Sequence, residues 1–313
     1  MQIKENIELS GFTTFKIGGP ARFFAEVKTE NDLQEAREFA RKNNLRYFFL
    51  SGGSNVLFSD EGFDGLVILN KINKKIESKK TWLGKTKVKV DGGVSLKRFL
   101  EFLAMAELSG FENLYGIPGS VSGAVRGNAG AFGTEVKDNL LSVEVFDFES
   151  GEFFNLKKED LKFGYRHSIF KEKKDCFVVS AEFVFRKGDR AEVTAKMQNI
   201  LAEREKRQLQ NIKSAGSFFK NPVAPEWLQK EFEKEKGVPA RASRVPAGWL
   251  IEKVGLKGAL IKSNLKLGEN SANYIINLGG ARASDLLEAR DLIKEKVKKQ
   301  FNIDLEEEVQ IVS

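Results

Sequence analysis

Glycine-rich segments in the first half of the chain are the first sign of a binding site. The segment GIPGSVSGAVRGNAGAFG, residues 116–133, holds six glycines, three alanines and a single charge, Arg126, in a chain that is 30% charged. Because glycine destabilises helices and strands, such a run favours tight turns or the close approach of a ligand to the backbone. Further glycine clusters lie at residues 13–21, 51–60 and 90–96.

Successive backbone N–H groups in tight glycine turns can bind an anion. The segment SGGSN, residues 51–55, follows the apolar run YFFL and is well placed for this, and GIPGSVSGA, residues 116–124, is a second candidate. Neither is a G-x-G-x-x-G fingerprint between a strand and a helix, and no glycine run ends in the G-K-[ST] of a P-loop. The common nucleotide motifs are therefore absent, and each segment alone is also compatible with a structural turn.

Metal and thiol chemistry find little support in the composition. His167 is the only histidine and Cys176 the only cysteine, so we expect no histidine dyad, internal disulfide or metal cluster. No apolar run approaches the roughly 20 residues of a membrane span, and the first residues do not resemble a signal peptide. These features predict a reducing, cytoplasmic location.

The net charge of +7 on 313 residues has two interpretations. It is compatible with an ordinary solvated surface, or with a field that attracts anionic ligands. Lysines are spread along the whole chain, which argues against a dedicated nucleic-acid face.

Periodicity and capping residues predict the elements around these segments. Residues 29–44 form a helix that begins at Thr29 with Asp32 at the capping-box position, and residues 95–110 and 190–208 form two more. Apolar alternation on both sides of Ser150–Gly151 predicts a hairpin. Many strands mixed with helices predict an α+β protein.

The pattern changes after about residue 209, and we place a boundary near 207–213. Helices are expected within 225–237 and 246–258 and after the glycine pair at 279–280, and a strand closes the chain at LEEEVQIVS. We find no internal repeat and no low-complexity linker.

Six segments in this order resemble one family. They are SGGSNVL, GIPGSVSGAVRGNAGAFG, YRHSIF, SAGSFFKNP, AGWLIE and LEEEV, within residues 13–311. Together they resemble the UDP-N-acetylenolpyruvoylglucosamine reductases, flavoenzymes of bacterial cell-wall synthesis. The chain has no evident insertion after YRHSIF and so resembles the class without a tyrosine-bearing loop over the substrate.

The resemblance implies an α+β fold with a two-subdomain FAD-binding part of the vanillyl-alcohol oxidase and p-cresol methylhydroxylase type. It implies subdomains at 1–70 and 71–208, a substrate-binding α+β domain at 209–303, and a C-terminal strand at 304–313 with the catalytic glutamate. FAD would be bound by the two glycine segments, through Ser51, Gly52, Gly53, Ser54, Asn55, Gly116, Ile117, Pro118, Gly119, Ser120, Gly123 and Ala124.

The catalytic residues implied are Ser217, Glu308 and Arg166. Ser217 matches the family's proton donor, Glu308 its catalytic glutamate, and Arg166 an arginine near the flavin and the substrate carboxylate, which suits bidentate pairing. From the residues alone, Ser217 is also compatible with a turn, and Arg166 and Glu308 with surface charge.

Substrate contacts are implied for Tyr165, Arg204, Arg207, Lys220 and Asn221. The chain departs from the family pattern at several positions. In the glycine-rich segment, Ser122 stands where the family commonly has glycine, and Arg126–Gly127 stand where it has an apolar pair. Leu209 and Glu307 each stand where the family usually has proline. Ser271 stands where it often has histidine, and Gln310 where some members have arginine.

The implied activity is the reduction of UDP-N-acetylglucosamine enolpyruvate by NADPH through bound FAD, in a monomer that binds neither nucleic acid nor a membrane. One alternative is a flavoenzyme of the same fold that oxidises a small alcohol or lactone; the SAGSFFKNP loop argues against it. Another is a basic, non-catalytic nucleotide binder, which would be colourless and sensitive to salt.

Overall fold

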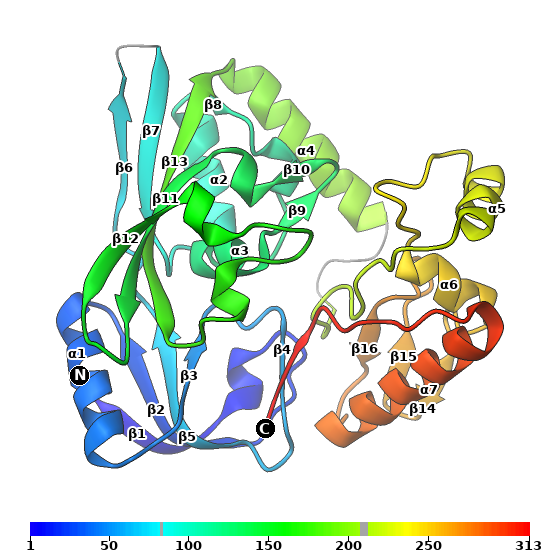
Figure 1. Ribbon diagram of the computed structural model, residues 1–313, viewed down its shortest axis with the longest axis horizontal. Coiled ribbons are helices and arrows are strands. Elements are labelled where there is room, and N and C mark those ends of the chain that lie inside the picture. The colour runs from blue at the N-terminus through cyan, green and yellow to red at the C-terminus, as the bar shows by residue number, and fades with distance from the viewer. Residues whose placement is uncertain (82–83, 207–211) are drawn as a thin grey trace. The chain divides into compact units, whose positions relative to one another are not determined.

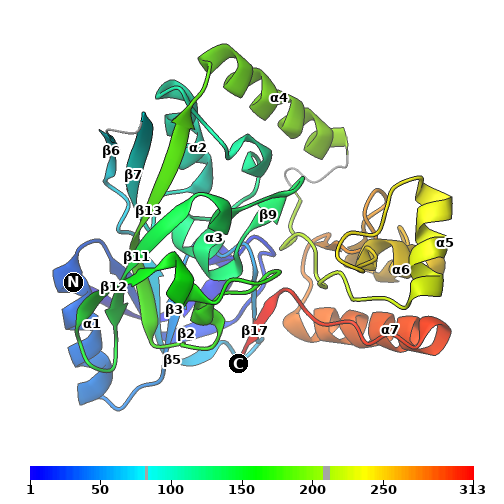
Figure 2. The same cartoon turned by 45° about the horizontal axis from the view of Figure 1, so that its top comes forward.

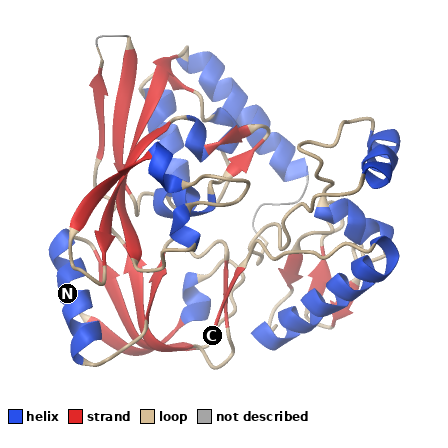
Figure 3. Ribbon diagram, in the orientation of Figure 1, coloured by secondary structure: helices blue, strands red, loops and turns tan. Residues whose placement is uncertain are grey.

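The computed structural model describes residues 1–81, 84–206 and 212–313. The chain divides into two compact units (Figure 1). Unit 1 consists of residues 1–7, 21–53 and 64–206, and unit 2 consists of residues 8–20, 54–63 and the part from residue 207 onward. Helices and strands occur in both units (Figure 3), so the expected α+β class is confirmed.

The first sheet of unit 1 has the strand order β1-β2-β5-β3. Its strands are β1 (Ile3–Glu8), β2 (Pro20–Val27), β5 (Phe63–Asn70) and β3 (Tyr47–Leu50), and β3 runs parallel to β5. The helix α1 (Glu30–Lys42) buries Leu33, Ala36 and Ala40 in one core with residues of this sheet. Its predicted capping box between Thr29 and Asp32 is present.

The second sheet of unit 1 is antiparallel, with the order β12-β11-β13-β7-β6, and β8 also pairs with β13. Its strands are β6 (Ile76–Lys80), β7 (Lys85–Asp91), β8 (Leu108–Ser109), β11 (Leu140–Asp147), β12 (Phe153–Lys157) and β13 (Cys176–Lys187). The predicted hairpin is β11–β12. The helices α2 (Leu96–Met105) and α4 (Arg190–Lys206) contact each other, as Figure 2 shows.

The glycine-rich segment of unit 1 contains a helix, whereas its glycine content favours tight turns. The helix α3 (Val121–Gly127) begins after Ser120, whose side chain accepts a hydrogen bond from the Gly123 N–H. It ends at Asn128, in the left-handed conformation with φ 42°. Burial of Val121, Ala124 and Val125 stabilises the helix and offsets the low helix propensity of its glycines. The short pair β9 (Gly130–Ala131) and β10 (Thr134–Glu135) follows.

Unit 2 combines helices with short strands. They are β4 (Val56–Phe58), α5 (Glu226–Lys236), α6 (Ala247–Lys253), β14 (Leu260–Lys262), β15 (Leu265–Leu267), β16 (Ile275–Asn277), α7 (Ala283–Phe301) and β17 (Gln310–Val312). The strands β14, β15 and β16 form an antiparallel sheet, and β17 runs parallel to β4. One core holds Trp249 of α6 with Leu286 and Ile293 of α7.

Single turns of 3₁₀ helix complete the described structure. They are Leu9–Phe12, Glu112–Leu114, Val136–Asp138, Lys158–Leu161 and Ile169–Lys171.

Candidate active site

The two predicted cofactor segments come into backbone contact within unit 1. A Cβ atom at Gly52 would lie 2.5 Å from Cα of Gly119, a distance that no real side chain tolerates. Gly119 itself has φ 114°, which residues with side chains rarely adopt. The other residues of this turn, Gly116, Ile117 and Pro118, lead into Gly119 without regular structure. Glycine at positions 52 and 119 therefore follows from how the two segments meet.

Three serine hydroxyls join these segments. Ser51 Oγ hydrogen-bonds to Ser120 Oγ and, at 2.7 Å, to Ser122 Oγ, and the last two hydroxyls are 3.2 Å apart. Asn70 Nδ2 lies 3.5 Å from Ser122 Oγ and donates to the Val178 carbonyl at 3.1 Å. Ser122 departs from the family's usual glycine, and the structure accommodates it as a buried member of this cluster.

The arrangement fits the pyrophosphate and ribityl parts of FAD. Phosphates in proteins are bound by backbone N–H groups of tight turns and by small hydroxyl side chains. Gly53 has positive φ, and Gly123 is exposed on α3, where a Cβ atom would lie 3.6 Å from Ser51 Oγ. Ala124, one residue further, is buried in the core of unit 1. Side chains at these glycines would fill the surface that a large planar cofactor needs.

The SGGSN segment continues into unit 2, to which Ser54 and Asn55 belong. Asn55 Nδ2 donates to the Glu308 carbonyl at 3.0 Å, and the Asn55 carbonyl accepts from the Gln310 N–H at 3.1 Å. These bonds continue into the β4–β17 ladder. The predicted cofactor residue Asn55 is thus bonded to the predicted catalytic residue Glu308, which sequence spacing could not reveal.

Arg166 is fixed within unit 1 by neighbours on both sides. Its Nη2 donates to the Gly130 carbonyl of β9 at 2.9 Å, and its guanidinium lies 5.3 Å from the centre of the Tyr165 ring. Its backbone is left-handed, with φ 52°. Ser168 Oγ donates to the Arg126 carbonyl at 2.7 Å, so the YRHSIF segment is anchored on the end of α3. The structure therefore places Arg166 beside the glycine-rich segment.

Arg204, in the last turn of α4, also lies against that segment. A Cβ atom at Gly116 would lie 2.8 Å from Arg204 Cδ, and the Arg204 guanidinium stacks over Phe132 at 5.6 Å. The other predicted basic residue, Arg207, lies outside the described residues, as does Leu209.

The segment with Ser217 is held in unit 2 by one asparagine. The Phe218 N–H donates to the Asn273 carbonyl at 2.8 Å, and the Asn273 side chain both accepts from Phe219 N–H, at 2.9 Å, and donates to Phe219 O, at 2.8 Å. Phe218 and Phe219 are fully buried, whereas Ser217 before them is partly exposed. Asn273 makes these bonds and is not among the predicted site residues, although it lies two residues after Ser271, a departure from the family pattern.

The acidic segment Glu306–Glu308 pairs with the same stretch. The Lys220 N–H donates to the Glu306 carbonyl at 2.9 Å, Phe219 bridges Glu307, and the Glu308 N–H donates to the Phe218 carbonyl at 2.8 Å. Glu308 lies in the bend just before β17. Unit 2 therefore brings Glu308 to the backbone of Phe218, the residue after Ser217, although Ser217 and Glu308 are 91 residues apart in sequence.

Side chains next to the paired segments 218–220 and 306–308 form ion pairs and hydrogen bonds. Lys220 Nζ pairs with Glu306, and Glu307, at the family's proline position, pairs with Lys294 of α7 at 2.9 Å. Asn221 Oδ1 accepts from the Ala247 N–H at 3.0 Å, at the start of α6. The predicted substrate residues Lys220 and Asn221 thus also have structural partners.

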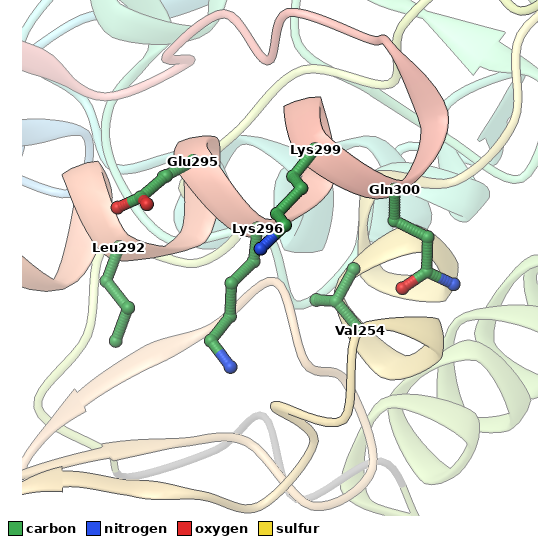
Figure 4. A pocket seen from close by; sticks show the side chains of 6 residues that line it. All are labelled: Val254, Leu292, Glu295, Lys296, Lys299 and Gln300. Atoms are coloured by element: carbon green, nitrogen blue, oxygen red, sulfur yellow. The ribbon is translucent and has the colours of Figure 1, made fainter.

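The described part of the chain shows neither a candidate metal site nor a candidate membrane-spanning helix. Within it, no group of three or more His, Cys, Asp or Glu is placed to hold a metal ion. None of its helices combines the length and apolar character that a membrane span requires. A separate cavity of about 510 Å³ lies in unit 2 along α7 (Figure 4). Its lining, Val254, Leu292, Glu295, Lys296, Lys299 and Gln300, includes none of the predicted site residues.

Comparison with known proteins connects these observations. A family model described as "UDP-N-acetylenolpyruvoylglucosamine reductase, C-terminal domain" matches residues 206–312, and one described as "FAD binding domain" matches residues 21–157. A UDP-N-acetylenolpyruvoylglucosamine reductase of Anoxybacillus flavithermus is 36% identical over 310 residues, which cover 99% of this chain and 94% of that protein. One of Fusobacterium nucleatum is 36% identical over 312 residues, 100% of both.

A solved structure agrees over the same length. The crystal structure of UDP-N-acetylenolpyruvylglucosamine reductase (MurB) from Thermus caldophilus matches with a TM-score of 0.76 and 31% identity, and the match covers 100% of both chains. The expected fold, a flavin-binding part followed by a C-terminal α+β domain, is thereby confirmed. The chain belongs to the UDP-N-acetylenolpyruvoylglucosamine reductase family.

Proposed function

We propose that this protein is an FAD-dependent oxidoreductase that reduces UDP-N-acetylglucosamine enolpyruvate to UDP-N-acetylmuramate with NADPH, a step in peptidoglycan precursor synthesis. Family membership and the FAD-binding domain match support this reaction. The observation that carries the proposal is the backbone pairing of the Ser217 segment with Glu308. Reduction of an enolpyruvyl ether needs a placed proton donor as well as a hydride, and the pairing supports Ser217 in that role.

The proposed cofactor residues lie on the two glycine segments, residues 51–55 and 116–124. Residues 51–55 bind the pyrophosphate through N–H groups and hydroxyls, and residues 116–124 line the flavin and its ribityl chain. When bound, FAD would supply hydride transfer from NADPH to the terminal carbon of the enolpyruvyl group. Because NADP⁺ leaves before the second substrate is reduced, the kinetics are ping-pong.

Ser217 donates the proton to the carbon that bears the carboxylate. A serine hydroxyl is a weak acid, so it needs a strongly basic acceptor and polarising neighbours. Its hydroxyl makes no hydrogen bond to the residues that the structure describes, and it is partly exposed, so it is available to a substrate. Glu308 orients or stabilises the enol-like intermediate, or relays the proton to Ser217.

Arginines and polar residues hold the substrate's anionic groups. Arg166, steadied by Tyr165 and the Gly130 carbonyl, pairs with the enolpyruvyl carboxylate. Arg204 and Arg207 bind a carboxylate or phosphate. Lys220 and Asn221 contact the phosphate or uracil end, where a substrate phosphate competes with Glu306 for Lys220.

The remaining proposals concern organisation and location. We assign FAD-binding subdomains to residues 1–70 and 71–208, the substrate-binding domain to 209–303 and the glutamate-bearing end to 304–313. The protein acts as a monomer in the cytoplasm, without nucleic-acid or membrane partners. The presence of one cysteine, Cys176, which forms no internal disulfide, supports a reducing compartment. Burial raises the pKa of this thiol to about 11.

An anaerobic visible spectrum tests the function. Purified protein should show flavin bands that bleach with NADPH and return when UDP-N-acetylglucosamine enolpyruvate is added. Bands that bleach but do not return would favour the flavoenzyme that oxidises an alcohol or lactone. A colourless protein that cannot be reconstituted with FAD would overturn the proposal.

A further inference from the structure

Arg126 is the one charged residue of the glycine-rich segment, and it lies, partly buried, in the last turn of α3. Residues three and four apart share a face of a helix, so Arg126 lies on the face of Gly123. Gly123 is the exposed position beside Ser51 Oγ and Ser120 Oγ. Helical side chains lean toward the preceding turn, which directs Arg126 back over Gly123.

The Arg126 guanidinium has no partner within the chain as described. Across residues 1–81, 84–206 and 212–313 it forms no ion pair, hydrogen bond or ring contact, although its carbonyl accepts from Ser168. Burial lowers the pKa of this guanidinium, so its charge is carried at a cost. Arg166, in contrast, donates to a carbonyl and stacks on a ring. A partly buried arginine without an acceptor calls for an anionic ligand.

The bound flavin supplies such an anion at one stage of the reaction. The serine cluster at the start of α3 suits the pyrophosphate, and Arg126 follows by two residues the segment 116–124 that we propose to line the flavin. The oxidised flavin ring is neutral. A hydride adds two electrons and one proton, so the ring becomes an anion unless its N1 takes up a second proton.

We propose that Arg126 is a further cofactor-binding residue of this chain, whose guanidinium contacts the flavin ring and stabilises its reduced, anionic form. The inference rests on the proposed flavin and deepens the assignment of its binding site. A cation fixed in a poorly solvated site stabilises charge that develops beside it. The reduced cofactor is therefore bound more tightly than the oxidised one, which raises the reduction potential.

The midpoint potential of the bound flavin tests this inference. Arg126→Met keeps an unbranched apolar side chain close to the length of arginine's aliphatic part and removes the charge, and Arg126→Lys keeps a cation. We expect Arg126→Met to weaken binding of reduced relative to oxidised FAD about tenfold, which lowers the two-electron potential by about 30 mV. Arg126→Lys should retain much of the potential, and the exposed control Arg190→Met all of it.

Binding and stability measurements separate the alternatives. An unchanged potential with weaker binding of oxidised FAD would assign Arg126 to the pyrophosphate, and an unchanged potential with a raised KM for the enolpyruvyl substrate would assign it to that substrate; either result overturns the inference.

We expect the Tm of the cofactor-free Arg126→Met protein to be unchanged or higher, because the charge has no partner in the chain as described. A lower Tm would indicate a structural role and contradict the inference. Should Arg126→Met not retain flavin, Arg126→Gln takes its place in the potential measurement. If the proposed function is wrong, the reduced flavin will not be reoxidised by the enolpyruvyl substrate. The potential and the Tm are measured without that substrate, so the two failures are distinguishable.

Discussion

The two units build their predicted sites by opposite means. In unit 1, residues 51–53 and 116–124 expose backbone, and the contact between Gly52 and Gly119 excludes side chains. In unit 2, the Ser217 segment is fixed by large buried rings, Phe218 and Phe219, and by the side chain of Asn273. A planar anionic cofactor needs space and N–H groups, whereas a weak acid needs one hydroxyl held in one place.

This difference predicts which kind of substitution impairs each unit most. Unit 1 should be sensitive to added atoms, because its function depends on empty surface. Unit 2 should be sensitive to removed atoms, because its function depends on bonds that place Ser217.

Replacing Ser217 by alanine should have the largest effect on the reaction. We expect the NADPH half-reaction to remain and reduction of the enolpyruvyl substrate to fall on the order of 10²- to 10⁴-fold, the usual contribution of a placed general acid. Stopped-flow spectra of the two half-reactions measure this. Ser214→Ala, in the same segment, is the control, since it removes a buried hydroxyl that has no hydrogen-bond partner in the described residues. A normal second half-reaction in Ser217→Ala would show that the proton donor is wrongly assigned.

Gly52→Ala should break the glycine contact of unit 1. Its Cβ atom would lie 2.5 Å from Gly119 Cα, so the segments must separate at a cost of about 1–3 kcal/mol, with loss of FAD affinity. Flavin fluorescence titration of the cofactor-free protein measures the affinity. The control is Gly127→Ala, where a Cβ atom meets nothing within 4 Å and helix propensity improves by up to about 1 kcal/mol. Equal affinities in the two variants would contradict the steric argument.

Asn273→Ala should destabilise unit 2 rather than unit 1. It removes both side-chain bonds to the buried Phe219 backbone, each of which costs about 1–3 kcal/mol when a buried partner is left unsatisfied. Urea unfolding, followed by tryptophan fluorescence, to which the buried Trp249 of unit 2 contributes, measures the loss. The affinity for FAD should change little, because the glycine contact lies in unit 1. A loss of affinity as large as that of Gly52→Ala would contradict the separate roles of the two units.

Asp60→Asn should have the smallest effect, of about 1 kcal/mol. The Asp60 carboxylate accepts from Ala283 N–H, at 2.7 Å, and Ser284 N–H, at 3.0 Å, at the start of α7. Burial alone would raise the Asp60 pKa, but these hydrogen bonds and the nearby Arg282 bring it below its usual value.

The sign of its pH dependence follows from that shift. A lowered pKa in the folded state means that the contribution of Asp60 is present above the unfolded value of about 3.9 and is lost as the pH falls through the folded pKa. Thermal unfolding from pH 7 to pH 2 should show the wild type lose its advantage over Asp60→Asn in acid. A constant difference would contradict the role of the charge.

Much of the fold could be predicted, because capping and periodicity are local properties. The box of Thr29 and Asp32 and the β11–β12 hairpin are encoded within a few neighbouring residues. The helix α3 was missed because burial of Val121 and Val125 outweighs the low propensity of glycine, and burial is not visible in local sequence. The length of the final strand was overestimated for a related reason, since only Gln310–Val312 find a partner in β4.

The sequence by itself determined the family, the two glycine segments and the identity of Ser217, Arg166 and Glu308 as candidates, because these depend on residue type and order. Only the tertiary structure decided which residues support them. The bond from Asn55 to the Glu308 carbonyl joins residues 253 apart, and the bonds from Asn273 to Phe219 join residues 54 apart. It also left Arg126 without a partner in the described chain. Hydrogen bonds and burial depend on distances in space, which the order of residues along a chain does not specify.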